Sequence, residues 1–138
     1  MKKLSYLLII FGCLLVLPYC KKELTRSELF KLLTTPTWTS DSLLANGDDA
    51  SGPGQLLEDF EGDAKFYENG TGYFGDYSGS WWFDNGETQI VINPDADTIP
   101  FNITCNIAEL TALSLKITAA VPDKYLVINQ IRMTFKAK

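Results

Sequence analysis

The sequence predicts an all-β protein, in which an antiparallel up-and-down meander of about eight strands closes into a barrel. Apolar and polar residues alternate over several short runs, as expected for half-buried strands whose successive side chains point to opposite faces. Gly, Asn, Asp and Pro residues separate these runs at short intervals, which is typical of hairpin connections. The interior of the barrel is therefore the first place where a binding site is expected.

The first 35 residues are expected to lie outside this barrel. Two lysines precede an apolar run from Leu4 to Leu17, and Cys20 stands directly before two further lysines. This pattern indicates a secretory signal peptide, and the run is shorter than the roughly 20 apolar residues that a membrane-spanning helix needs. We expect a signal peptide over residues 1–20, a tether with one short helix over 21–35, and the barrel domain over 36–138.

The segment Leu17-Pro18-Tyr19-Cys20 resembles the signal of bacterial lipoproteins, although the tyrosine stands where that signal usually has a small residue. The resemblance implies that the mature chain begins at Cys20, which carries lipid. Cys13 is the alternative lipidation site, but it would leave an apolar run on the mature chain. An uncleaved anchor helix gives the same membrane attachment. The expected location is the cell envelope of a Gram-negative bacterium, at the outer membrane, with periplasmic and surface exposure both open.

Composition excludes several classes of function. Of the 12 basic residues two lie before Cys20, and the remaining ten face 17 acidic residues, so nucleic acid is not an expected partner. The chain has no histidine, which removes the commonest general base and metal ligand. We therefore predict no catalytic residues, no metal and no cofactor. Cys105 falls in an alternating run and is expected to be a small core residue.

An acidic cluster is the one feature that suggests a cation. Its carboxylates are of the type that calcium binds, but they lack the spacing of a known calcium loop, so a solvated acidic rim is the favoured interpretation. The cluster comprises Asp48, Asp49, Glu58, Asp59, Glu61 and Asp63.

The expected elements follow in chain order. A short helix begins with Thr25 as N-cap and Glu28 in a capping box, and it ends before Pro36. Asn69-Gly70 predicts a type I′ hairpin turn, and residues 45–56 form a longer loop. The runs that predict strands cover residues 38–44, 57–66, 79–83, 99–107, 113–119 and 125–135, with shorter strands beginning at Tyr73 and around residues 90–92.

Several short motifs resemble the lipocalin-like domain of small Gram-negative lipoproteins. They are a Trp after the short helix, a Phe before an Asn-Gly-Thr turn, a Gly two residues before a Trp, and a spaced apolar run near residue 110. One departure is Pro36, where the lipocalin pattern has Gly. The resemblance spans roughly residues 36–136 and implies a calycin-type barrel that carries a small apolar molecule. The motif residues are Trp38, Phe66, Asn69, Gly70, Thr71, Gly79, Trp81, Ile107, Leu110, Thr111 and Leu115.

The alternation selects the side chains that face the interior. They either line a ligand cavity or fill a small barrel, and Trp38 is expected to plug its base. Tyr73 and Asn129 are candidate polar anchors for a ligand. The inward set is Phe66, Tyr73, Trp81, Phe83, Ile90, Ile92, Phe101, Ile103, Leu115, Ile117, Val127 and Ile131.

Two functional hypotheses follow. The first is a lipid-anchored carrier of a small apolar ligand without catalytic activity. The alternative is an interaction or inhibitor module with a filled core, which binds an envelope protein or a glycan through its loops and exposed aromatic residues. Trp82 is expected to point outward, and together with Tyr77 it is the candidate contact for such a partner.

Overall fold

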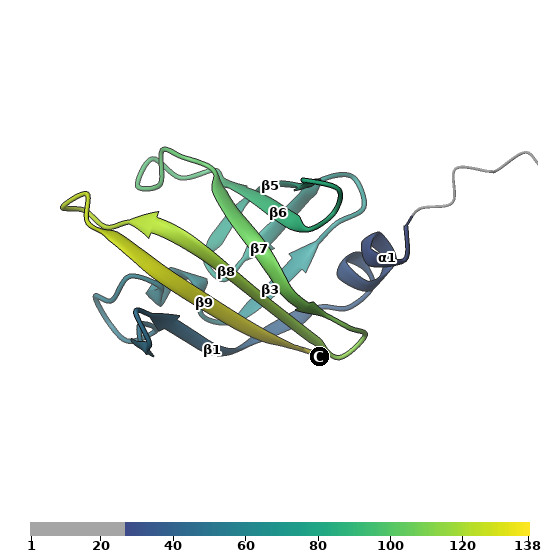
Figure 1. Cartoon of the computed structure of the whole chain (residues 1–138), viewed down its shortest axis with the longest axis horizontal. Coiled ribbons are helices and arrows are strands. Elements are labelled where there is room, and N and C mark those ends of the chain that lie inside the picture. Colours follow the sequence, from purple (N-terminus) through teal and green to yellow (C-terminus); the bar gives the residue numbers. More distant parts are fainter. Residues whose placement is uncertain (1–26) are drawn as a thin grey trace, which may run out of the picture.

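The structure is a computed structural model that describes residues 27–138, and it confirms the predicted all-β barrel. Eight antiparallel strands form a closed up-and-down barrel, one short strand extends its edge, and a single short helix packs at one end (Figure 1). The elements are α1 (Glu28–Thr34), β1 (Trp38–Ala45), β2 (Asp48–Asp49), the 3-10 turn η1 (Glu58–Phe60), β3 (Asp63–Phe66), β4 (Thr71–Phe74), β5 (Tyr77–Asp84), β6 (Gln89–Pro94), β7 (Ile103–Leu110), β8 (Ser114–Pro122) and β9 (Ile128–Ala137).

The first and last strands close the barrel. β1 pairs with β9 from Trp38 opposite Ala137 to Ala45 opposite Ile131, with an irregularity between Ser40 and Ser42. Each of the other barrel strands pairs with its neighbour in the chain, and β2 pairs with β1 alone. All eight barrel strands therefore have at least two partners, and the short β2 is left as the exposed edge.

The core follows the predicted alternation closely in β5 to β9. Ile90, Cys105 and Leu115 have no exposed surface, and their sequence neighbours on the strands are polar or outward. Four aromatic rings fill the part of the interior nearest α1, with neighbouring ring centroids 5.1 to 5.5 Å apart. This part of the barrel is consequently packed solid. The four rings are those of Phe66, Phe74, Trp81 and Phe83.

The helix closes one end of the barrel. Trp38 is fully buried there, and its indole Nε1 donates to the Leu33 carbonyl at 3.0 Å. The Lys65 ammonium donates to the carbonyls of Thr34, Thr35 and Pro36 at 2.8, 2.9 and 3.0 Å. These bonds satisfy carbonyls that the last turn of a helix leaves without partners. We call this the closed end. Trp38 lies at the base of the barrel, as the sequence predicted.

The helix begins later than predicted. Ser27 is the N-cap, because its hydroxyl accepts a hydrogen bond from the Phe30 amide at 3.0 Å and the helix starts at Glu28. The prediction of Thr25 as cap is wrong, and that residue lies outside the described residues. Ser27 also donates to the Glu87 carboxylate, which ties the start of α1 to the β5–β6 turn.

Three predicted strands are shorter than their alternating sequence suggests. Residues 57–62 hold η1 and a bend, so the strand predicted over 57–66 begins at Asp63. Likewise β7 begins at Ile103 and β9 at Ile128, and the residues just before them form loops. Alternation of apolar and polar residues shows which side chains are buried, but it does not show whether the backbone pairs with a neighbouring strand. Buried apolar residues in the preceding loop therefore extend the alternating pattern beyond the strand.

The turns also differ from prediction. At Asn69-Gly70 only the glycine has positive φ, so the turn is not type I′. Asn46 and Gly47 both have positive φ, at 53° and 89°, and they join β1 to β2 in the two-residue hairpin that such a pair favours. The sequence carried the same Asn-Gly signal at both places, and the loop predicted over residues 45–56 is a hairpin in its first part.

Candidate functional site

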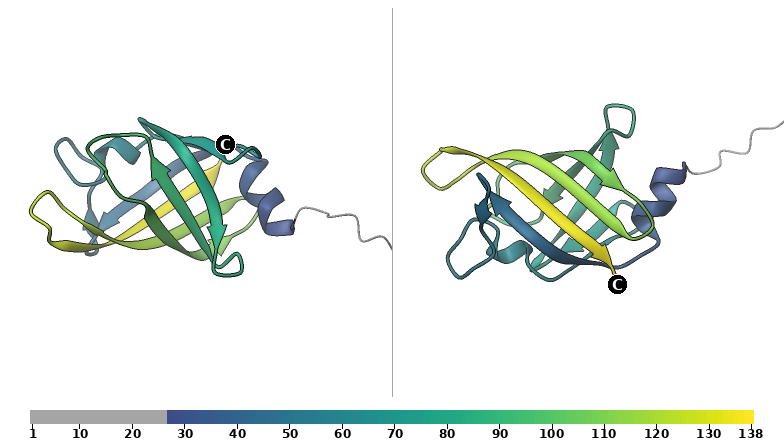
Figure 2. Two further views of the ribbon diagram at one scale, coloured as in Figure 1. Left: turned by 90° about the horizontal axis from the view of Figure 1, so that it is seen from above. Right: turned by 60° about the horizontal axis from the view of Figure 1, so that its bottom comes forward.

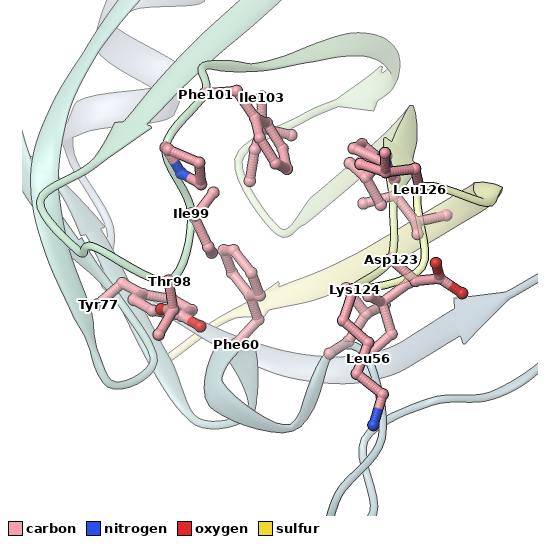
Figure 3. Close-up of a pocket in the computed structure, with 15 residues that line it drawn as sticks. Leu56, Phe60, Tyr77, Thr98, Ile99, Phe101, Ile103, Asp123, Lys124 and Leu126 are labelled. Carbon is pink, nitrogen blue, oxygen red and sulfur yellow. The ribbon is translucent and has the colours of Figure 1, made fainter.

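A cavity of about 380 Å³ opens at the end of the barrel opposite α1, which we call the mouth (Figure 3). It is lined mainly by apolar side chains, and five separate segments meet around it. They are the loop between β2 and β3 (Leu56, Leu57, Phe60), the start of β5 (Tyr77), the β6–β7 loop with the start of β7 (Thr98–Phe101, Ile103), the end of β8 with its following turn (Val121–Lys124, Leu126), and Ile131 of β9.

The loop over residues 50–62 covers part of the mouth, and we call it the lid segment. Ala50, Leu57 and Phe60 are buried in the core cluster, although this segment lies outside the strands. The Ala50 amide donates to the Leu43 carbonyl at 2.8 Å, and the Leu57 amide donates to the Ala50 carbonyl at 2.9 Å. The lid segment is therefore held down by its own apolar side chains and by backbone bonds to β1.

Tyr77 fastens the lid segment to the barrel wall. Its ring packs on Phe60 with centroids 4.9 Å apart, and its hydroxyl donates to the Asp59 carboxylate at 2.9 Å. Partial burial, followed by the bond to Asp59, raises the pKa of the Tyr77 phenol, so the hydroxyl stays protonated at neutral pH. This hydroxyl and that of Thr98 are the polar groups beside the apolar side chains on this side of the cavity (Figure 3).

The two charged residues of the wall are turned away from the cavity. The Asp123 carboxylate accepts hydrogen bonds from the amides of Tyr125 and Val127 in its own turn, at 2.8 and 2.9 Å. The Lys124 ammonium lies 5.0 Å from the centre of the Tyr125 ring. The space between Phe60 and Leu126 is consequently bordered by hydrocarbon and suits an uncharged, apolar molecule (Figure 3).

The predicted inward residues divide into three groups. Phe101, Ile103 and Ile131 line the cavity, and Tyr73 and Val127 lie outside the interior. The remaining seven pack in the core below the cavity: Phe66, Trp81, Phe83, Ile90, Ile92, Leu115 and Ile117.

The prediction of Val127 as an interior residue is wrong. Its side chain is 57% exposed on the β8–β9 turn, because Leu126 adopts a left-handed backbone and β9 starts only at Ile128. Tyr73 is also misplaced, since its neighbours Gly72 and Phe74 are the buried residues of β4. The Tyr73 ring instead packs against the Tyr67 ring, with centroids 6.2 Å apart.

Asn129 is not a polar anchor within the cavity. Its carbonyl oxygen accepts from the Asn46 side chain at 2.8 Å, and its amide donates to the Val127 carbonyl at 3.0 Å. The first of these bonds joins the β1–β2 hairpin to the start of β9. The side-chain amide of Asn129, which was predicted to bind a ligand, is therefore already bonded to the local backbone and to a neighbouring turn.

The two aromatic residues proposed as a joint surface contact lie on opposite faces of β5. Trp82 points outward and is 41% exposed, whereas Tyr77 packs against the core and lines the mouth. Trp82 stands directly opposite Val91 on β6, which is almost fully buried although it lies outside the core cluster. Covering Val91 is thus a structural role for Trp82 that needs no partner.

Three carboxylates of the predicted acidic cluster have individual local partners. Asp49 accepts from Ser51, Glu58 from the Gly54 amide, and Asp63 pairs with Lys138 at 2.7 Å. Within residues 27–138 no three side chains of His, Cys, Asp or Glu gather closely enough to hold a metal ion. Cys105 lies in the core, where burial raises the pKa of its thiol to about 12.

Sequence reasoning missed the lid segment as part of the site, and from the loop before β7 it named only Phe101. The available signal was a group of apolar residues, such as Leu56, Leu57 and Phe60, inside a region rich in Gly and Asp. Apolar side chains in such a loop indicate that it folds back onto a core.

The chain matches no protein-family model and no curated protein with which it was compared. Among residues 27–138 there is no helix with the length and apolar character to cross a membrane. The expected lipidation site at Cys20 and the rest of the signal peptide lie outside the described residues. The fold and the mouth cavity are therefore the structural basis for the functional proposal.

Proposed function

We propose that this chain is a lipid-anchored lipoprotein of the Gram-negative cell envelope, whose lipocalin-like barrel carries a small apolar ligand and catalyses no reaction. The observation that carries the proposal is the apolar cavity at the mouth, with a volume of about 380 Å³. Ligand pockets span about 300–1,000 Å³, so this volume suits a small molecule. The packed aromatic rings of the closed end confine the ligand to the mouth.

The cavity combines the features that a carrier of an apolar molecule needs. Its wall is mainly hydrocarbon, its charged residues face away, and the Tyr77 hydroxyl at one side is already bonded to the Asp59 carboxylate. Reversible binding also requires a route of entry, and the cavity is already open at the mouth, so entry does not require release of the lid segment. Catalysis forms no part of the proposal, because the chain has no histidine and Tyr77 remains protonated.

Native mass spectrometry of the mature chain tests this proposal directly. The chain is residues 20–138 with Cys20→Ser, which contains every strand of the barrel, purified from the envelope of its own cells. We expect an additional mass that disappears on denaturation and that identifies the ligand. A bare mass in every preparation, together with no binding of an apolar probe, contradicts the carrier function.

A pair of variants locates the binding site. Ile99 is half-buried at the rim of the cavity, so Ile99→Glu places a charge in the mouth without entering the core. We expect the affinity for N-phenyl-1-naphthylamine, an uncharged fluorescent probe, to fall at least tenfold. Leu113→Glu is the matched control, because Leu113 is exposed at the opposite end, and it should leave the affinity unchanged. Equal affinities for both variants would place the probe elsewhere.

A further inference from the structure

The turn between β8 and β9 ends in a run of exposed apolar side chains. Tyr125, Leu126, Val127 and Ile128 are 74%, 82%, 57% and 58% exposed, and we call these four residues the apolar tip. The tip projects from the barrel at the end opposite α1 (Figures 1 and 2). Four consecutive exposed apolar residues are unusual on a protein surface and mark an interaction site.

The tip has a defined backbone conformation. Asp123 accepts hydrogen bonds from two amides of the turn, and its own amide donates to the Val127 carbonyl at 2.9 Å. Leu126 has a φ of 63°, a conformation that is unfavourable for a large side chain. The fold thus holds this leucine outward in a tight turn. A tip ordered before binding loses less conformational entropy when it meets a partner.

Charge separates the hairpin from the rest of the described chain. Residues 110–138 hold five basic residues and one acidic residue, whereas residues 27–109 hold two basic and 15 acidic residues. No acidic residue lies within β8 or β9. The part of the barrel that carries the apolar tip is therefore also the part where positive charge exceeds negative charge.

Of the five basic residues, Lys124 and Arg132 are available to a partner, and Lys138 pairs with Asp63. Lys116 and Lys136 form exposed ion pairs with Glu109 and Asp41 on the neighbouring strands. Lys124 lies within the turn, and Arg132 is exposed on β9; neither forms an ion pair within residues 27–138. Lys124 and Arg132 thus add positive charge beside the apolar tip and along the hairpin that supports it.

We propose that the β8–β9 hairpin is a docking surface for an anionic lipid bilayer. The apolar tip enters the boundary between headgroups and acyl chains, and Lys124 and Arg132 contact the anionic headgroups. Apolar burial supplies the attraction at the tip. The charge separation favours this orientation, because residues 27–109 hold 15 acidic and two basic residues and are repelled by the same surface.

A bilayer fits this surface better than a second copy of the chain. A two-fold dimer through the hairpin would place basic residues against basic residues. A bilayer receives such a tip without a preformed pocket. Leu126 and Lys124 also line the mouth, so docking brings the opening of the cavity next to the membrane. The docking surface does not depend on the proposed ligand or on lipid at Cys20.

Vesicle sedimentation of residues 20–138 with Cys20→Ser tests the proposal. We expect binding to vesicles of phosphatidylcholine and phosphatidylglycerol at 3:1, and weaker binding to phosphatidylcholine alone. The double variant Leu126→Ser, Val127→Ser should bind both kinds of vesicle at least tenfold more weakly. Leu113→Ser is the matched control, because Leu113 is 75% exposed at the closed end, and it should change binding less than twofold.

The charge contribution has its own variant. Lys124→Gln with Arg132→Gln should lower binding to the anionic vesicles about thirtyfold and leave binding to phosphatidylcholine unchanged, because each basic residue near an anionic surface contributes about 1 kcal/mol. Urea unfolding of every variant establishes that the barrel is intact. The proposal is overturned if the parent chain binds neither vesicle, or if the tip variant binds as the parent does. Self-association that the tip variant abolishes, without vesicle binding, also overturns it and identifies a protein interface.

Discussion

Replacing Lys65 by methionine should loosen the closed end of the barrel. The Lys65 ammonium donates to three successive carbonyls at the C-terminus of α1, at 2.8 to 3.0 Å. It also places a positive charge at the negative end of the helix dipole. Methionine keeps most of the apolar length of the side chain and removes the charge and all three donors, so the change isolates the polar interaction.

The structure sets the expected size of the effect. Two of the three bonds, to Thr34 and Pro36, are partly buried, and the third, to Thr35, is exposed, so its carbonyl regains water when the lysine is lost. A hydrogen bond that involves a charged group contributes about 1.5–3 kcal/mol when sheltered and less when wet. We therefore expect Lys65→Met to lower the free energy of unfolding by about 2–3 kcal/mol.

Urea unfolding followed by tryptophan fluorescence measures this loss, and hydrogen exchange locates it. The amides of α1 should exchange faster in the variant, while those of β7 to β9 keep their relative protection. Lys116→Met is the matched control, because Lys116 makes one exposed ion pair, with Glu109, and its loss should cost less than about 1 kcal/mol. Equal losses in the two variants would refute the assigned role of Lys65 as the cap of α1.

Three further predictions follow from the same packing. Trp38→Phe leaves the buried Leu33 carbonyl without its donor and should cost about 1–3 kcal/mol of unfolding free energy; an unchanged urea midpoint would contradict it. Gly79→Ala brings a Cβ within 2.2 Å of the Asn93 carbonyl oxygen, so overpacking should cost about 1–3 kcal/mol or more, measured the same way; a loss below about 0.5 kcal/mol would show that the strands separate easily. The hydrogen bond that Lys138 donates holds the pKa of Asp63 below its ordinary value. The stability that this interaction contributes is therefore present above about pH 4 and is lost as the pH falls through the pKa of Asp63 in the folded chain. The urea midpoint of Asp63→Asn should accordingly change less between pH 5 and pH 3 than that of the parent chain, and parallel curves would argue against this linkage.

The strands of the second half could be predicted because their alternation is regular. Ile103, Cys105, Leu115, Ile117 and Ile131 all face the core, as period-two patterning requires. The pattern did not show where pairing starts. The same alternation continues through Ile99 and Phe101, yet both lie in the β6–β7 loop and line the mouth. Their side chains pack at the core although their backbones are not paired in the sheet, because packing of an apolar side chain does not require strand pairing.

The candidate site was only partly predictable, because its wall comes from segments that are distant in sequence. Phe101, Ile103 and Ile131 were predicted as interior residues and do border the cavity. Leu57 and Phe60 reach it only because the lid segment folds back over the barrel end. No local pattern determines how far a loop folds back, since that depends on the apolar surface the finished barrel leaves uncovered.

The all-β class, the number of barrel strands and the inward face of each regular strand could be predicted without the structure, because these depend on residue periodicity and on local turn chemistry. Only the folded chain shows the register in which β9 pairs with β1, the aromatic packing that fills the closed end, and the cavity that remains at the mouth. It also turned Val127 outward with the apolar tip. These properties depend on volumes and contacts between residues far apart in the chain, and such contacts exist only once the barrel has closed.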